Sequence, residues 1–206
     1  SEVGATSCTE CDAGTYEKNN LNCVECNAGF FSPTVGANMC TKCASGAVSE
    51  AGATSCTECN AGTYESKKID CLSCPAGKFQ EFKGANSTAA CIFAQPGTFV
   101  STQGSSVAEK CSKGTFSLNR GSLECLMCTA GSFSDEGDSS CTLCQAGFVS
   151  STGASSCGKC QPGTYAPNPG GASCLICAAG KYSDYEGATR CTDCESGSFS
   201  AAGSSV

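Results

Sequence analysis

The sequence predicts a small disulfide-rich fold of β-strands and loops: an elongated, solenoid-like rod of tandem repeats with almost no helix. Two observations lead to this prediction. Cysteine accounts for 22 of the 206 residues, a density typical of disulfide scaffolds in oxidising compartments. A short motif of Cys, Gly and an aromatic residue also recurs along the chain, which is typical of repeat proteins. Because no segment sustains a helical period of 3.6 residues, short strands and turns are expected.

The repeated unit is roughly 15–17 residues long and reads C-x-x-C-x-x-G-x-[F/Y]-x(n)-C. The Gly allows a positive φ just after the cross-link, and the ring two residues later is the one large apolar group that a module can bury. A second Gly or Asn, four residues before the next Cys in many modules, indicates a turn. Twelve modules carry this Gly, at Gly14, Gly29, Gly46, Gly62, Gly77, Gly97, Gly114, Gly131, Gly147, Gly163, Gly180 and Gly197.

A longer period of three modules divides the chain. Residues 1–16 return at 49–64 with two differences in sixteen. The predicted units of three modules are 1–48, 49–100, 101–149 and 150–199, and 200–206 starts a further unit. We therefore expect the chain to be a segment of a longer array.

One apolar position follows the same period. The residue after the first Cys of a pair is apolar in every third module, at Val24, Leu72, Leu126 and Leu175. Two interpretations stay open. Each side chain covers the disulfide of its own module, or the four form a stripe along one face that contacts a copy of the rod. The stripe requires three modules to make about one turn of the solenoid.

The cysteine pattern favours one pairing scheme. Every Cys belongs to a C-x-x-C pair except Cys91 and Cys111, whose missing companions fall at Ala94 and Ala108. If the second Cys of each pair bonds the first Cys of the next, this double loss removes a single bond and leaves no orphan. The scheme predicts the disulfides Cys11–Cys23, Cys26–Cys40, Cys43–Cys56, Cys59–Cys71, Cys74–Cys91, Cys111–Cys125, Cys128–Cys141, Cys144–Cys157, Cys160–Cys174 and Cys177–Cys191, with Cys8 and Cys194 bonded to modules outside the chain.

Two other pairing schemes remain open. Bonds within each C-x-x-C would close small strained rings and would need a separate Cys91–Cys111 bridge. A crossed scheme, which joins first Cys to first Cys, needs that same bridge or leaves an orphan. The serial scheme needs neither, and each of its loops contributes about 3 kcal/mol in the chain-entropy model.

The unit C-x-x-G-x-[F/Y]-x(n)-C-x-x-C resembles the cysteine-rich repeats of ephrin-receptor-like ectodomains and the simplest single-disulfide module of tumour necrosis factor receptors. Residues 111–116, CSKGTF, and 194–199, CESGSF, match the opening of that module. The resemblance covers nearly the whole chain and implies the same serial pairing. Long uninterrupted arrays of such modules resemble protist surface antigens and flagellar-hair (mastigoneme) proteins, whereas receptors mix module types.

Composition argues against several classes of function. The chain has no His, so the usual general base is missing and no enzymatic activity is expected. Paired C-x-x-C motifs have the spacing of a four-Cys zinc site, but their unbroken series favours disulfides, and no metal or other cofactor is expected. A net charge of −7 without basic clusters argues against nucleic acid as a partner. No apolar run approaches the ~20 residues of a membrane span.

Two surface features concern modification and ions. The sequon Asn86-Ser87-Thr88 lies in the Cys74–Cys91 loop and predicts N-glycosylation of Asn86. The acidic residues Asp135, Glu136 and Asp138 are interpreted as solvated turn residues, with weak calcium binding as the alternative.

These features predict an extracellular or cell-surface structural protein, a stiff disulfide-stapled rod in a surface coat or filament. Its expected partners are copies of itself or other coat or filament proteins, and glycans are expected on its surface. The alternative is the ligand-binding ectodomain of a cell-surface receptor. Such an ectodomain would carry a module with a distinctive cluster of exposed aromatic or Arg residues, and the sequence shows none.

Overall fold

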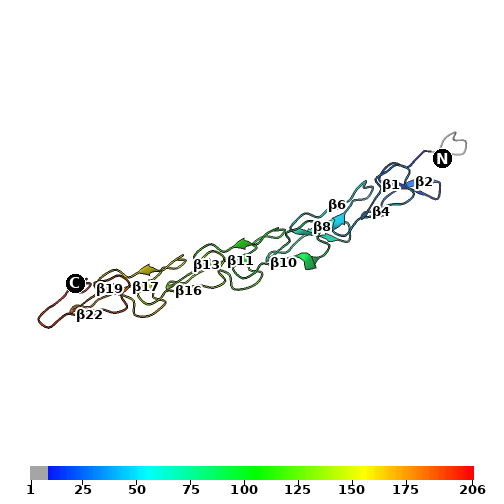
Figure 1. The fold of residues 1–206 in the computed structure, drawn as a ribbon. Helices are drawn as coiled ribbons and strands as arrows, with labels where there is room; N and C mark the ends of the chain where they lie inside the picture. The colour runs from blue at the N-terminus through cyan, green and yellow to red at the C-terminus, as the bar shows by residue number, and fades with distance from the viewer. Residues whose placement is uncertain (1–8) are drawn as a thin grey trace. The chain divides into compact units, whose positions relative to one another are not determined.

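The computed structural model of the chain describes residues 9–206, in which the β-strands form eleven separate antiparallel pairs (Figure 1). The helical segment in these residues is a single 3-10 turn, η1 (Thr88–Ala90). None of the described residues forms a helix with the length and hydropathy that crossing a membrane requires. The small disulfide-rich tandem-repeat fold predicted from the sequence is confirmed.

The chain divides into two compact units, which are described separately. The first unit runs to Phe93 and includes Val100–Ala108, and the second comprises Ala94–Phe99 and Glu109–Val206. The hairpins of the first unit are β1 (Thr15–Lys18) with β2 (Asn22–Glu25), β3 (Phe30–Phe31) with β4 (Thr41–Lys42), β5 (Ala47–Val48) with β6 (Thr57–Glu58), β7 (Thr63–Ser66) with β8 (Asp70–Ser73), and β9 (Lys78–Phe79) with β10 (Ile92–Phe93). Those of the second unit are β11 (Thr98–Phe99) with β12 (Glu109–Lys110), β13 (Thr115–Phe116) with β14 (Leu126–Met127), β15 (Ser132–Phe133) with β16 (Thr142–Leu143), β17 (Phe148–Val149) with β18 (Gly158–Lys159), β19 (Thr164–Tyr165) with β20 (Leu175–Ile176), and β21 (Lys181–Tyr182) with β22 (Thr192–Asp193).

Every hairpin has the same construction. Its first strand includes the aromatic or Val position of the module. Its second strand includes the two residues between the two Cys positions of the next pair, where Ala94 and Ala108 each replace one Cys. In β13–β14, for example, Phe116 is opposite Leu126 and Thr115 is opposite Met127. Because an isolated two-stranded hairpin is at best marginally stable in water, each one depends on the cross-links and neighbouring modules that hold it.

Two hairpins of the first unit are longer than the others. The strands of β1–β2 and β7–β8 have four residues each, and their disulfides close the shortest loops, with a sequence separation of 12. Each turn places two consecutive non-Gly residues at positive φ, Asn19 and Asn20 in one and Lys67 and Lys68 in the other. Positive φ at both central residues defines the type I′ turn, whose twist matches that of paired strands.

The buried core consists of small side chains. We number the modules 1 to 12 by their Gly, from Gly14 to Gly197. The second Cys of each C-x-x-C pair up to Cys177 is almost completely enclosed, and Cys26 and Cys128 are 0% exposed. The rings are less buried than the sequence predicts, because a two-stranded hairpin has no second layer to cover its outer face. The rings, and Val48 and Val149 at the same position in modules 3 and 9, are half-buried in the first eleven modules, and Phe199 is 94% exposed.

Backbone hydrogen bonds join each module to the next one. In the second unit, the Gly131 N–H donates to the Ser150 carbonyl at 2.9 Å, and the Gly153 N–H donates to the Cys128 carbonyl at 2.8 Å. The same two bonds recur along the array, so the backbone groups beside the disulfides find their partners in neighbouring modules.

Each module also lies against the module two positions further on. A Cβ built on Gly131, in module 8, would lie 2.0 Å from the carbonyl oxygen of Gly170, in module 10. In the first unit the pair Gly14 and Gly52 is equally close, at 2.1 Å. A repeat array held by such contacts between near neighbours has local stability, as in other solenoids.

Candidate functional site

Ten disulfides form a serial ladder along the described residues. Each joins the second Cys of one pair to the first Cys of the next, across Cα–Cα distances of 5.4 to 5.8 Å and sequence separations of 12 to 17. These are the same ten pairs as in the predicted serial scheme. Closing loops of this size restricts the unfolded chain by about 3 kcal/mol each in the chain-entropy model, so the ladder is the main source of stability for a chain with so small a core.

Module 6 has no disulfide, and small apolar residues occupy its interior. Ala94 stands at the position of the second Cys and is 0% exposed, like the cysteines it replaces. Val100 is 3% exposed and fills the position after the ring, which is Ser in seven of the twelve modules. Burying a Val side chain contributes about 1.5–3 kcal/mol, which partly offsets the lost cross-link. The boundary between the two compact units falls in this module.

The two remaining cysteines, Cys8 and Cys194, lie beyond the first and last disulfides of the ladder in the sequence. Cys194 has a free thiol and is half-buried. Cys8 lies outside the described residues. Their bonds to further modules stay predictions.

The four apolar residues of the predicted stripe are exposed, each on its own hairpin. Directly opposite residues of an antiparallel pair lie on the same face of the sheet, with Cβ atoms about 4.5–5.5 Å apart. Each of the four is opposite the ring of its own module, so each hairpin presents an apolar patch of two residues. The pairs are Tyr16 with Val24 (36% exposed), Tyr64 with Leu72 (44%), Phe116 with Leu126 (56%) and Tyr165 with Leu175 (47%).

The second residue between two paired cysteines, which follows the stripe residue where a module has one, has a different role. Met127, Leu143 and Ile176 each cover the turn Gly of the module two positions on, at 3.4 to 3.6 Å from a Cβ built there. They remain 62% to 66% exposed, so they contact a neighbouring module with part of the side chain. The sequence signal is their place as the second residue between two cysteines.

Buried serines contribute to the packing between modules and are not predicted from the sequence. The Ser150 hydroxyl donates to the Ser132 carbonyl at 2.9 Å, and the Ser134 hydroxyl donates to the Thr115 carbonyl at the same distance. Because each hydroxyl is hydrogen-bonded, its burial is not penalised. The available signal was Ser directly after the ring, at Ser32, Ser49, Ser117, Ser134, Ser150, Ser183 and Ser200.

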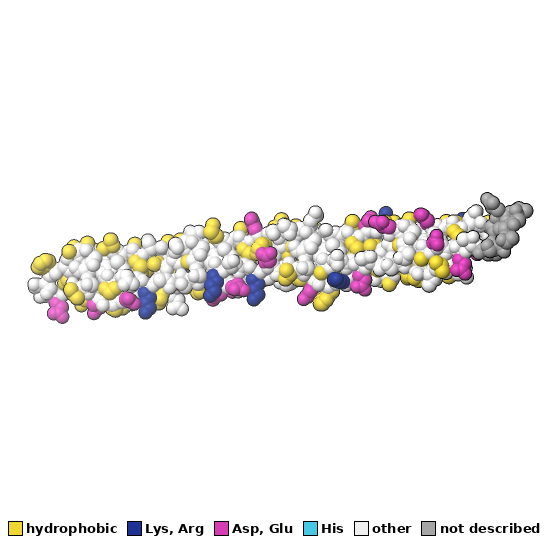
Figure 2. All heavy atoms as spheres, turned by 90° about the horizontal axis from the view of Figure 1, so that it is seen from above, with side chains coloured by type: hydrophobic (Ala, Val, Ile, Leu, Met, Phe, Trp, Pro, Cys, Tyr) yellow, Lys and Arg dark blue, Asp and Glu magenta, His cyan; other side chains and the backbone are white. Residues whose placement is uncertain are grey.

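The acidic loop of module 8 is neutralised by lysines. Glu136 lies 3.7 Å from Lys110, and Asp135 lies 3.3 Å from Lys113. The Asp138 carboxylate accepts a hydrogen bond from the Asp135 backbone N–H at 2.7 Å. Within residues 9–206 no three potential ligands converge on a metal position. Figure 2 shows acidic and basic side chains side by side along the second unit, and such exposed pairs contribute at most about 1 kcal/mol each.

Glu65 is the anchor of the β7–β8 turn. Its carboxylate accepts hydrogen bonds at 2.8 Å from both the side-chain Nζ and the backbone N–H of Lys68. These two bonds hold the pKa of Glu65 below its ordinary value of 4.5. In the equivalent β1–β2 turn, Glu17 accepts a hydrogen bond from the Asn20 N–H.

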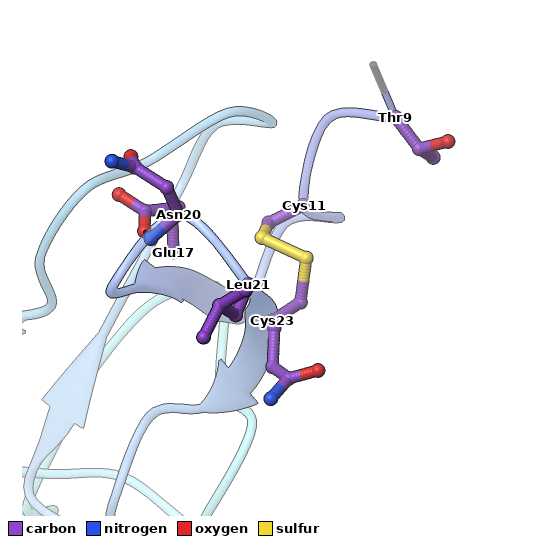
Figure 3. A pocket seen from close by; sticks show the side chains of 7 residues that line it. Thr9, Cys11, Glu17, Asn20, Leu21 and Cys23 are labelled. Carbon is purple, nitrogen blue, oxygen red and sulfur yellow. Dashed lines mark hydrogen bonds between the residues drawn. A yellow bond between two sulfur atoms is a disulfide. The ribbon is translucent and has the colours of Figure 1, made fainter. Parts of the chain in front are cut away.

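A shallow groove of about 320 Å³ lies beside the Cys11–Cys23 disulfide (Figure 3). Glu17, Asn20 and Leu21 line it, and Leu21 is 70% exposed. Its one ionisable side chain, Glu17, is engaged in the turn described above. The lining offers a polar and apolar surface without an arrangement of nucleophile and base.

Comparison with known families agrees with this structure. A family model described as tyrosine-protein kinase ephrin type A/B receptor-like matches residues 14–51, 46–91 and 147–194. Together these stretches include more than half of the chain and lie in both units. No curated protein matches the chain. The chain therefore belongs to the tyrosine-protein kinase ephrin type A/B receptor-like family of cysteine-rich repeats.

Proposed function

We propose that the chain is an extracellular structural repeat protein, a stiff disulfide-stapled component of a surface coat or filament. The observation that carries this proposal is the serial ladder, in which one module type is repeated and cross-linked ten times. Disulfides in such numbers persist in oxidising compartments outside the cell. The family match supports the same location.

Under tension, the disulfides would carry force directly between neighbouring modules. Cys128 and Cys141 are 13 residues apart in sequence, and their disulfide holds the two Cα atoms 5.7 Å apart. A free stretch of that length would extend to about 45 Å. Because every cross-linked module has this arrangement, a chain under tension could extend only slightly within these modules. Resistance to extension is a property that a coat or filament requires.

Electron microscopy of the native material tests the proposal. Ordered filaments or a continuous coat are the expected result, since a uniform array has no module set apart for a ligand. Isolated molecules, each bound to a different protein, would contradict the structural function and support the ligand-binding ectodomain of a receptor instead.

The proposed partner in such an assembly is a second copy of the chain, which would contact the four apolar patches at Val24, Leu72, Leu126 and Leu175. Each patch consists of an exposed aliphatic side chain and the ring opposite to it. Removing apolar surface from water favours association by about 25 cal/mol per Å². Repetition of one patch at every third module would add these contributions along two aligned copies.

A double variant tests this contact. Leu126→Ser combined with Leu175→Ser should abolish lateral association, as seen by sedimentation and microscopy, while peptide mapping finds the disulfides intact. Leu118→Ser combined with Leu123→Ser is the matched control, because both residues lie in the second unit, are 63% and 53% exposed and fall outside the repeated position. Assembly that is equal in both double variants would refute the contact.

A further inference from the structure

The loop closed by Cys74 and Cys91 differs from the other stapled loops. Its cysteines are 17 residues apart, whereas the other nine pairs are separated by 12 to 14. The extra residues include the turn η1, which no other described module contains. Asn86 and Ser87 precede this turn, Thr88 is its first residue, and all three are exposed. The loop therefore presents a tripeptide at the surface of the first unit.

The side chain of Asn86 is fixed by one contact. Its Nδ2 donates a hydrogen bond to the Ser45 hydroxyl at 3.1 Å, from module 5 to module 3. An amide nitrogen carries two hydrogens, and this bond uses one of them. Substitution of the other hydrogen leaves the contact with Ser45 available. The folded loop thus accommodates a group attached to Nδ2 without loss of a hydrogen bond.

We propose that Asn86 is an N-glycosylation site, an inference that rests on the extracellular location proposed above. The tripeptide Asn86-Ser87-Thr88 has the acceptor pattern N-x-[S/T]. In the reaction, Nδ2 forms a bond to C1 of an oligosaccharide carried on a polyprenyl pyrophosphate. The bond from C1 to the pyrophosphate oxygen breaks, the lipid pyrophosphate leaves with the electron pair, and the amide loses one proton.

A second asparagine provides an internal comparison. Asn38 is also exposed, and it is followed two residues later by Cys40. The Cys40 sulfur is bonded to Cys26, so no thiol is left at the position where Asn86 has the Thr88 hydroxyl. The structure thus favours Asn86 over Asn38 as the acceptor.

A glycan at Asn86 would also restrict assembly. It would project from a point where modules 3 and 5 meet, because Ser45 and Asn86 are hydrogen-bonded there. A bulky hydrated sugar at this point prevents close approach of another copy along that edge. Lateral contacts of the first unit would therefore use its other faces.

The test is expression of the chain as a secreted protein in eukaryotic cells, followed by treatment with peptide N-glycosidase. We expect the enzyme to increase gel mobility and to leave Asp at position 86, as read by peptide mapping. Asn86→Gln and Thr88→Ala should each abolish the added mass that the glycosidase removes. Ser87→Ala and Asn38→Gln should retain it, because both leave the Asn86 sequon intact.

Two results would refute glycosylation of Asn86. One is a secreted, correctly cross-linked wild-type chain without enzyme-sensitive mass, which would leave the extracellular location standing. The other is enzyme-sensitive mass that persists in both Asn86→Gln and Thr88→Ala. Failure of secretion itself would instead count against the proposed location, so the two failures can be distinguished.

Discussion

Gly131 and Gly180 occupy the same position in their modules but have different surroundings. Their φ angles are 84° and 80°, and their N–H groups donate to the carbonyls of Ser150 and Ser200. A Cβ on Gly131 would collide with the carbonyl of Gly170, whereas no described atom lies within 4 Å of a Cβ on Gly180. Both positions need Gly for their positive φ, but only Gly131 also needs the absence of a side chain because of a contact with another module. A comparison of the two therefore distinguishes these two effects.

We expect Gly131→Ala to be far more damaging than Gly180→Ala. Both substitutions place a side chain in the left-handed region, which costs about 1–2 kcal/mol. At position 131 the backbone of module 10 must also move, so thermal unfolding should occur at a clearly lower temperature and fewer molecules should reach the native disulfide pattern. Equal effects of the two substitutions on the unfolding temperature would contradict the contact between modules 8 and 10.

Glu65 gives the β7–β8 turn a dependence on pH. Its pKa is lowered in the folded protein by the hydrogen bonds from Lys68. A lowered carboxyl pKa contributes stability above its unfolded value of about 4.5, and this contribution is lost as the pH falls through the folded pKa. NMR titration of the Glu65 carboxyl should give a midpoint below 4.5. Lys68→Met should raise this midpoint, and an unchanged midpoint in that variant would be inconsistent with the assigned cause.

At the scale of the hairpin, the two type I′ turns differ in how well their residues suit positive φ. Asn tolerates the left-handed region better than Lys, and β1–β2 has Asn19 where β7–β8 has Lys67. Lys67 is exposed. Lys67→Asn should stabilise β7–β8 by up to about 1 kcal/mol, since Asn escapes part of the left-handed penalty, whereas Lys67→Val should destabilise it. Amide hydrogen exchange of residues 63–73 measures both, and faster exchange in Lys67→Asn would refute the prediction.

Much of each element can be predicted from the sequence because its determinants are local. The spacing of the cysteines fixes the hairpins, and the joint loss at Ala94 and Ala108 leads to the serial ladder found in the structure. The packing between modules is different, because it depends on where a neighbouring backbone places its carbonyl groups. The hydrogen bond of the Ser150 hydroxyl and the contact of Gly131 with module 10 are of this kind. The sequence pattern identifies these residues, but it does not give the rotation between successive modules that brings their backbones together.

At the scale of the whole chain, the ladder has one long interruption. Between Cys11 and Cys191, most stretches outside a disulfide loop are the two residues between paired cysteines. The exception is residues 92–110, which follow Cys91 and precede Cys111. The two compact units divide within this stretch. A break of the backbone there leaves no covalent link between the two parts of the chain.

This topology predicts the outcome of cleavage at two matched sites. A protease recognition sequence is inserted after Gln103 in one variant and after Thr152 in the other, because both residues are exposed and directly precede a turn Gly. On a denaturing gel without reductant, cleavage after Gln103 should release two fragments. Cleavage after Thr152 should leave one band until reductant is added, because Cys144–Cys157 spans the cut.

The same gel separates the serial ladder from the pairing schemes that need a Cys91–Cys111 bridge. Bonds within each C-x-x-C, with a rescuing Cys91–Cys111 bridge, would reverse the result: the chain cut after Gln103 would stay linked and the chain cut after Thr152 would fall apart. A crossed scheme with that bridge would reverse the result in the same way, because its bonds on either side of Thr152 would be Cys128–Cys144 and Cys157–Cys174, and neither spans the cut. Release of two fragments at Gln103 alone is expected for the serial ladder and excludes both schemes that need the Cys91–Cys111 bridge, because that ladder combines a closed loop at module 9 with an open one at module 6.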